Sequence, residues 1–214
     1  MNMSRTRIKI CGITRIEDAR CAADAGADVI GLIFYAGSPR VVTTEQALSI
    51  SNALPPFVST VALFVNAAPG EVEDVIDRLR PSLLQFHGDE DPAYCTQFGV
   101  PFVKALRVGS RMAAGDLLEY ADTFSTARAL LLDTLSSGAY GGSGESFDWR
   151  IIPDAMRNRI VLAGGLGPHN VAAAVRAVRP WAVDVSSGVE INKGVKDHAR
   201  IMKFTEEVRH ADAS

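Results

Sequence analysis

The sequence predicts an α/β fold, a single-domain (β/α)8 TIM barrel that spans residues 1–214. Three observations lead to this prediction: eight short apolar runs recur along the chain, helix signals lie between them, and each repeating unit averages about 27 residues. That average is close to the smallest unit that an eight-stranded barrel permits. A chain of 214 residues, 47% of them hydrophobic, can also bury a substantial core without disulfides or metal ions.

The eight apolar runs have the length and composition of strands in a parallel sheet that is covered on both faces. They are Ile8–Cys11, Val29–Phe34, Val61–Val65, Leu83–Phe86, Phe102–Leu106, Ala129–Leu132, Ile160–Ala163 and Ala182–Val185. An open doubly wound sheet is the main alternative, but it usually has about five or six strands and a Gly-x-Gly-x-x-Gly turn after the first. No such turn follows the first run, so we favour the barrel.

Helix signals separate the predicted strands. Thr14 and Glu17 have the spacing of a capping box, in which hydroxyl and carboxylate bind the first amides of a helix. Pro69 and Pro92 suit the first turns of two further helices. Gly26 follows the first helix, where a left-handed cap is expected.

Composition and charge exclude several classes of protein. The net charge of −3 and the absence of a basic stripe argue against a general nucleic-acid binder. The N-terminus is polar, and the apolar runs are too short to cross a membrane. Three cysteines without a CxxC pair fit a reducing compartment. We therefore expect a soluble, cytoplasmic protein that binds a small molecule and neither a membrane nor nucleic acid.

In this fold the active site lies at the carboxyl ends of the strands, where Cys11 ends the first run and Asp133 directly follows the sixth. Lys9 has the parity of Cys11, so both side chains should face the barrel interior, where the ammonium would favour the thiolate. Asp184, on the neighbouring last strand, is a plausible partner for Lys9, and a purely structural pair is the alternative. Cys11 and Asp133 could serve one substrate as base and acid.

Two loops have the composition of a phosphate site. Gly164 and Gly165 follow the seventh strand, and Ser186, Ser187 and Gly188 follow the eighth. These two loops form the recurrent phosphate site of the fold, because glycine lets backbone amides approach an anion closely. Either loop alone could be a plain turn, but both in the last two units favour phosphate. The glycines run into a proline at position 168, which suits a first helical turn and its amide donors.

Further polar residues should lie at the same rim. Arg40 suits bidentate binding of a carboxylate, although a solvated loop charge would also explain it. His87 follows the fourth strand. The connection Thr134–Asp148 is rich in glycine and serine and begins beside Asp133, so we interpret it as a mobile lid. No cluster of histidine, cysteine or carboxylate residues has the spacing of a metal site.

Seven motifs in chain order resemble the phosphoribosylanthranilate isomerase family of tryptophan biosynthesis. They are Lys9–Thr14 (KICGIT), Ser38–Arg40, Gln85–Gly88, Leu132–Asp133, Gly141–Gly144 (GGSG), Leu162–Leu166 (LAGGL) and Asp184–Glu190 (DVSSGVE). Each motif is a weak signal alone, but their combination across nearly the whole chain is specific. Val41 departs from the family pattern, which often has an aromatic residue there.

The resemblance implies an Amadori rearrangement of N-(5'-phosphoribosyl)anthranilate to 1-(2-carboxyphenylamino)-1-deoxyribulose 5-phosphate. On this interpretation Asp133 is the general acid that protonates the furanose ring oxygen, and Cys11 is the general base that removes the C2' proton. Arg40 would hold the anthranilate carboxylate, and the glycine and serine loops would hold the phosphate. No cofactor is required, because the aldehyde–amine adduct activates its own C2' proton.

Two other hypotheses are open from the sequence. One is a different sugar-phosphate isomerase, such as the histidine-pathway aminoaldose isomerase, although such enzymes are expected to use paired aspartates where this chain has Cys11. The other is a non-catalytic barrel that binds a phosphate metabolite, which would need no protonatable pair. Whether the protein is a monomer or a homodimer is undecided at this level.

Overall fold

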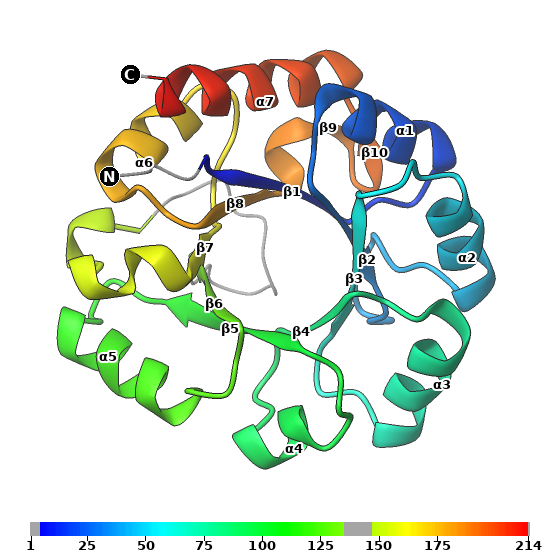
Figure 1. Cartoon of the computed structure of the whole chain (residues 1–214), viewed down its shortest axis with the longest axis horizontal. Coiled ribbons are helices and arrows are strands. Elements are labelled where there is room, and N and C mark those ends of the chain that lie inside the picture. The colour runs from blue at the N-terminus through cyan, green and yellow to red at the C-terminus, as the bar shows by residue number, and fades with distance from the viewer. Residues whose placement is uncertain (1–4, 135–146, 214) are drawn as a thin grey trace.

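The computed structural model describes residues 5–134 and 147–213, and a closed barrel of eight parallel strands forms its centre (Figure 1). The strands are β1 (Arg7–Cys11), β2 (Val29–Ile33), β3 (Ser59–Phe64), β4 (Leu83–Phe86), β5 (Phe102–Val108), β6 (Ala129–Thr134), β7 (Ile160–Leu162) and β8 (Ala182–Val185). They follow one another around the barrel in chain order, and β8 pairs with β1 to close it. The predicted barrel is confirmed, and the open-sheet alternative is wrong.

Helices surround the barrel on its outer side (Figure 1). They are α1 (Ile16–Ala25), α2 (Thr44–Asn52), α3 (Pro69–Leu79), α4 (Pro92–Thr96), α5 (Ala114–Thr123), α6 (Val171–Val178) and α7 (His198–Asp212). Three short 3-10 segments accompany them: η1 (Trp149–Ile151), η2 (Asp154–Arg159) and η3 (Ser187–Val189). A small antiparallel hairpin, β9 (Glu190–Asn192) and β10 (Val195–Lys196), lies between β8 and α7 and was not predicted.

Two predicted features lie largely outside the described residues. Most of the connection predicted as a lid, residues 135–146, and the whole Gly141–Gly144 motif are not among them.

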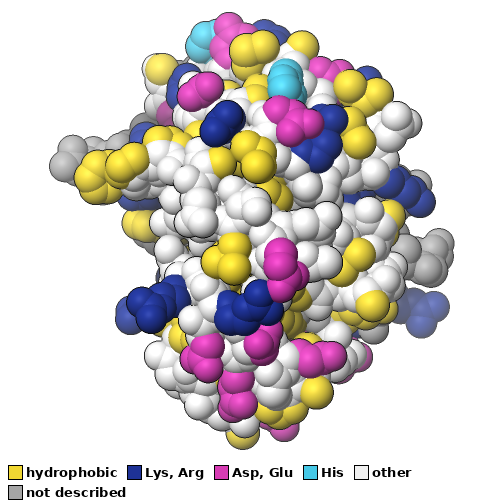
Figure 2. Space-filling model, turned by 90° about the vertical axis from the view of Figure 1, so that its right-hand side faces the viewer, with side chains coloured by type: hydrophobic (Ala, Val, Ile, Leu, Met, Phe, Trp, Pro, Cys, Tyr) yellow, Lys and Arg dark blue, Asp and Glu magenta, His cyan; other side chains and the backbone are white. Residues whose placement is uncertain are grey.

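Within the described ranges, no helix is long and apolar enough to cross a bilayer. On the face shown in Figure 2, acidic and basic side chains are interspersed.

The start of α1 differs from the predicted capping box. The helix begins at Ile16, and the hydroxyl of Thr14 donates to the carbonyl of Gly194 at 2.5 Å instead of capping the helix. The side chain of Arg15 contacts Asp18, which lies one turn further into the helix, with an N···O distance of 2.6 Å. The left-handed cap at Gly26 is confirmed by its φ of 94°. Contacts with the distant hairpin therefore override the local capping signal at the helix start.

Alternation along β1 divides its side chains between two environments. Ile8 and Ile10 belong to the large cluster that the strands form with the surrounding helices. Lys9 and Cys11 point into the barrel, as their parity predicts. The interior is filled by small and medium side chains of β5 to β8, among them Ala105, a packing that closes the barrel below the strand ends.

Asp18 connects α1 to the hairpin and to α7. Its side chain is fully buried and accepts hydrogen bonds from Arg15, from the backbone N–H of Lys196 at 3.1 Å and from His198 Nε2 at 2.9 Å. Burial alone would raise the pKa of Asp18, but these donors lower it further than burial raises it, and the net pKa is lowered. The ionised carboxylate therefore stabilises the fold.

We expect Asp18→Asn to lower the free energy of unfolding at pH 7 by roughly 2–4 kcal/mol, because a buried charge network loses its anion. The pKa of Asp18 is lower in the folded than in the unfolded chain, so this contribution is complete above the unfolded pKa and disappears as the pH falls through the folded pKa. The gap between variant and wild type should therefore narrow between pH 5 and pH 3 in urea titrations. The exposed Asp24→Asn in the same helix is the control. A gap that stays constant with pH would contradict the assignment.

Candidate active site

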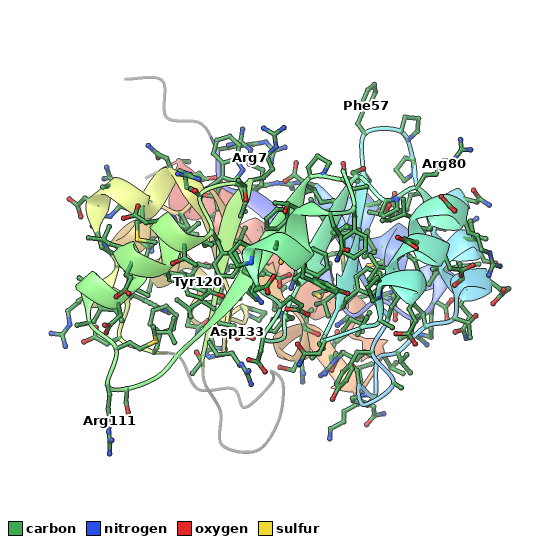
Figure 3. The ribbon with its side chains drawn as sticks, turned by 90° about the horizontal axis from the view of Figure 1, so that it is seen from below. Arg7, Phe57, Arg80, Arg111, Tyr120 and Asp133 are labelled. Atoms are coloured by element: carbon green, nitrogen blue, oxygen red, sulfur yellow. The ribbon has the colours of Figure 1, made fainter. Side chains whose placement is uncertain are left out.

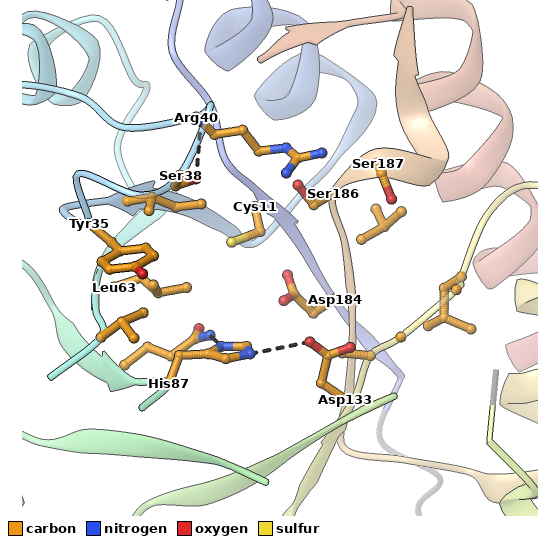
Figure 4. A pocket seen from close by; sticks show the side chains of 18 residues that line it. Cys11, Tyr35, Ser38, Arg40, Leu63, His87, Asp133, Asp184, Ser186 and Ser187 are labelled. Carbon is orange, nitrogen blue, oxygen red and sulfur yellow. Dashed lines mark hydrogen bonds and ion pairs between the residues drawn. The ribbon is translucent and has the colours of Figure 1, made fainter. Parts of the chain in front are cut away.

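A cavity opens at the carboxyl ends of the barrel strands (Figure 4). Figure 3 places Asp133 toward this end of the barrel and Arg7, Phe57 and Arg80 at the opposite end. Most of the site residues expected from the sequence line the cavity: Cys11, Arg40, His87, Asp133, Gly164, Gly165, Asp184, Ser186 and Ser187. The barrel therefore brings together residues that are up to 176 positions apart in the chain, from Cys11 to Ser187.

Cys11 lies beside a buried ion pair. The Nζ of Lys9 is 2.9 Å from Oδ1 of Asp184, and both side chains are about nine-tenths buried. Burial lowers the pKa of Lys9, but Asp184 and Cys11 raise it further, so the ammonium stays charged. For Cys11, burial raises the pKa more than Lys9 lowers it. Lys9 therefore favours the thiolate as expected, but burial outweighs this effect, and the net pKa of the Cys11 thiol is raised.

Close approach of β2 holds this thiol in place. A Cβ atom on Gly31 would lie 2.8 Å from Sγ of Cys11 and 3.1 Å from Nζ of Lys9. Gly31 is the register partner of Cys11 in the sheet. The absence of a side chain at position 31 therefore makes the space that the thiol and the ammonium occupy.

Each of the two carboxyl oxygens of Asp133 has a hydrogen-bond partner. The backbone N–H of Thr134 donates to Oδ1 at 2.8 Å, and His87 Nε2 lies 3.2 Å from Oδ2 (Figure 4). The side-chain amide of Gln85 lies 2.9 Å from His87 Nδ1. With the amide nitrogen of Gln85 as donor, the imidazole proton is on Nε2 and points at Asp133. His87, expected from the sequence as a substrate-binding residue, lines the cavity and contacts Asp133 there.

Arg40 is part of an ion pair that was not predicted from the sequence. Its Nε and one terminal nitrogen donate to the two carboxylate oxygens of Glu190, each at 2.7 Å. Glu190 holds Arg40 at the cavity wall, which leaves the opposite edge of the guanidinium for a ligand carboxylate. In the sequence, a glutamate stands directly after the serine loop, between the apolar residues Val189 and Ile191. Its position in an apolar stretch is the feature that could have indicated a charged partner for Arg40.

The two glycine- and serine-rich loops lie against each other. Gly164 and Gly165 both have positive φ, 82° and 64°, which favours glycine. A Cβ on Gly188 would overlap the carbonyl of Leu166, so Gly188 packs one loop on the other. Gly188 is not among the described residues that line the cavity, although we expected it from the sequence to bind the phosphate.

The turn before α6 also differs from the prediction. The helix begins at Val171, so Pro168 lies in the preceding turn and not in a first helical turn. The side chain of Asn170 orders this turn, since its Oδ1 accepts from Gly167 N–H and its Nδ2 donates to Gly165 carbonyl, both at 2.9 Å. The glycine loop is thus shaped by an asparagine side chain and not by a helix start at the proline.

Comparisons with known proteins agree with this geometry. The family model described as N-(5'-phosphoribosyl)anthranilate (PRA) isomerase matches residues 8–207. The chain belongs to the PRA isomerase family. A PRA isomerase of Pseudomonas fluorescens (strain Pf0-1) is 55% identical over 97% of this chain and 100% of its own. One from Thiobacillus denitrificans is 52% identical over 95% of this chain and 98% of its own.

Solved structures of the PRA isomerase family share the whole fold. The Thermotoga maritima enzyme superposes with a TM-score of 0.85 at 40% identity, covering 96% of this chain and 99% of its own. A PRA isomerase in complex with reduced 1-(o-carboxyphenylamino)-1-deoxyribulose 5-phosphate superposes with a TM-score of 0.83 at 38% identity, with the same coverage. The 3-hexulose-6-phosphate synthase of Salmonella typhimurium, 16% identical with a TM-score of 0.68, shares the barrel fold alone.

We expect Gly31→Ala to lower the free energy of unfolding by roughly 1–3 kcal/mol, because the added methyl group overpacks the wall that holds Cys11 and Lys9. Gly115→Ala in α5 is the matched control, since its Cβ would meet open space and alanine favours a helix. Urea unfolding of both variants measures the difference. Equal stability of the two variants would contradict the close packing at position 31.

The rate at which iodoacetamide alkylates Cys11 should keep rising above pH 9, because burial raises the pKa of this thiol and only the thiolate reacts. Lys9 lowers that pKa, so Lys9→Met should slow alkylation at pH 8 further. Mass spectrometry of the peptide that contains Cys11 measures the rate, and the urea-unfolded chain supplies the reference profile. A plateau already at pH 7 would overturn the assigned direction.

Proposed function

We propose that this chain isomerises N-(5'-phosphoribosyl)anthranilate to 1-(2-carboxyphenylamino)-1-deoxyribulose 5-phosphate, with Asp133 as general acid and Cys11 as general base. The observation that carries the proposal is the placement of these two groups in one cavity of a PRA isomerase family member, on β6 and β1 of the barrel. Each has its own set of orienting partners, so the two can take different protonation states.

In the first step, Asp133 gives its proton to the furanose ring oxygen as the bond between that oxygen and C1' breaks. The nitrogen lone pair forms the C1'=N bond, and the sugar opens to a protonated Schiff base. Asp133 enters this step as the carboxylic acid and leaves it as the carboxylate. The N–H of Thr134 and the Nε2–H of His87 then stabilise the negative charge that develops on its two oxygens.

In the second step, Cys11 removes the proton from C2' as the thiolate. The electron pair of the C2'–H bond moves toward the iminium nitrogen and gives the enolamine, which tautomerises to the ketone. The ammonium of Lys9 stabilises the thiolate, and Asp184 holds the ammonium in place across the β1–β8 pair. The iminium ion supplies the electron sink, so the reaction requires no cofactor.

Binding groups for both ends of the substrate line the same cavity. We assign the anthranilate carboxylate to the edge of Arg40 that does not face Glu190. Backbone amides of Gly164, Gly165 and the serine loop would bind the phosphate, because successive amides and glycine allow a close approach. All of these residues come from a single chain, so a monomer can carry out this chemistry. The free cysteines fit the proposed cytoplasmic location.

A direct assay tests the proposal. The purified protein is mixed with freshly generated phosphoribosylanthranilate, and the loss of substrate fluorescence is followed over time. Turnover is expected for this substrate and not for the aminoaldose substrate of the histidine pathway. Fluorescence that decays only at the uncatalysed rate would refute the proposed activity, and turnover of the histidine-pathway substrate alone would favour the other isomerase.

We expect Cys11→Ala and Asp133→Asn each to lower kcat by about 10²–10⁴-fold, the usual contribution of a general acid or base. Cys11→Ser should also be poor, because a hydroxyl is a much weaker base than a thiolate. The same assay measures the loss, and circular dichroism with urea unfolding shows that each variant is folded. Near wild-type turnover of a folded variant would remove that residue from its assigned role.

A further inference from the structure

One buried ammonium lies between the two anion-binding parts of the proposed site. The Nζ of Lys196, on β10, is 2.8 Å from Oε1 of Glu190, 3.1 Å from the carbonyl oxygen of Ser186 and 3.3 Å from its hydroxyl. The Lys196 side chain is fully buried and is not among the residues that line the cavity. The proposed mechanism does not use it.

Through Glu190, this ammonium acts on the position of Arg40. The Oε1 of Glu190 accepts hydrogen bonds from the Lys196 ammonium, from the Nε–H of Arg40 and, at 3.3 Å, from the N–H of Gly194. The Glu190 side chain is 5% exposed, so water cannot readily replace a lost donor. Without Lys196, Glu190 would lose the charged donor that orients its carboxylate, and the Arg40 pair would lose its fixed geometry.

Through Ser186, the same ammonium acts on the loop that follows β8. Lys196 holds both the carbonyl and the hydroxyl of Ser186, which lines the cavity. Arg40 and Ser186 also approach each other, since a Cβ on Gly12 would lie 2.5 Å from Cδ of Arg40 and 3.1 Å from Oγ of Ser186. Figure 4 shows the guanidinium end of Arg40 beside Ser186.

The charges of this group suit an anionic ligand. Arg40 and Lys196 share one carboxylate, Glu190, so the group carries one more positive than negative charge when Lys196 is protonated. Burial lowers the pKa of Lys196, and a nearby anion would favour its charged form. An excess charge in a nearly buried group is costly unless a counter-charge is supplied. An anion bound in the adjoining cavity would supply it.

We propose that Lys196 is a positioning residue that sets the spacing between Arg40 and the Ser186 loop, and so selects a substrate with a carboxylate and a phosphate at its two ends. This inference rests on the proposed function for the identity of the substrate. Lys196 does not line the cavity and acts through Glu190 and Ser186. The cost of losing it should therefore fall on KM more than on kcat.

The test compares two buried lysines. Lys196→Met removes the ammonium and keeps the unbranched chain, and it should raise KM for phosphoribosylanthranilate by about tenfold or more, with a smaller change in kcat. Lys104→Met is the matched control, because Lys104 is equally buried and its ammonium is also 2.8 Å from a glutamate, Glu90. The control should lose stability to a similar extent while KM stays within twofold of wild type.

Glu190→Gln breaks the same chain of contacts from its other end. It should also raise KM, although it makes the group more positive, because Arg40 loses its two-bond partner. A fall in KM in this variant would show that charge and not position governs binding, and would overturn the proposal. Glu190→Gln and Ser186→Ala give the answer if Lys196→Met does not fold. KM within twofold of wild type in Lys196→Met, or in both of these variants, would also overturn it.

A ligand-binding measurement separates this inference from the proposed function. Inorganic phosphate is added to wild type, Lys196→Met and Lys104→Met, and the thermal unfolding midpoint is followed. Phosphate should stabilise wild type and Lys104→Met more than Lys196→Met. This result together with an inactive wild type would reject the isomerase activity and keep Lys196 as an organiser of the anion site. Equal stabilisation of all three proteins would reject the role of Lys196.

Discussion

The pairing of β8 with β1 closes the barrel and sets Lys9 opposite Asp184. Two charges taken out of water cost several kcal/mol each, and only close contact in a low-dielectric interior offsets that cost. The 2.9 Å contact between these side chains meets the requirement, and Lys9 then lies beside the thiol of Cys11. Barrel closure thus creates the electrostatic environment in which the proposed base works.

The same closure places the chain after β8 over the mouth of the barrel near α1 and β2. The β9–β10 hairpin reaches Asp18 on α1 through the backbone of Lys196, and Glu190 reaches Arg40 after β2. Hydrogen bonds from one hairpin therefore hold parts of the first, second and last units of the barrel together. The proposed carboxylate and phosphate sites lie at this junction, so fold stability and substrate positioning depend on the same contacts.

Much of the fold and of the site could be predicted from local patterns. Buried parallel strands must be apolar on both faces, so the eight runs stood out, and the two-residue period placed Lys9 and Cys11 inside the barrel. The end of a strand is where this fold builds its site, so Asp133 could be assigned a place next to a ligand. The capping box at Thr14 failed because the Gly194 carbonyl, 180 residues away, binds the hydroxyl instead.

By itself, the sequence determined which residues lie at the strand ends, because strand length and alternation are local properties of the chain. Only the tertiary structure decided what each of these residues contacts. Burial outweighs the neighbouring ammonium and raises the pKa of Cys11, the amide of Gln85 contacts Nδ1 of His87, and Glu190 accepts two N–H groups of Arg40. Desolvation and hydrogen-bond partners depend on segments that meet in space, and no local pattern in the chain encodes them.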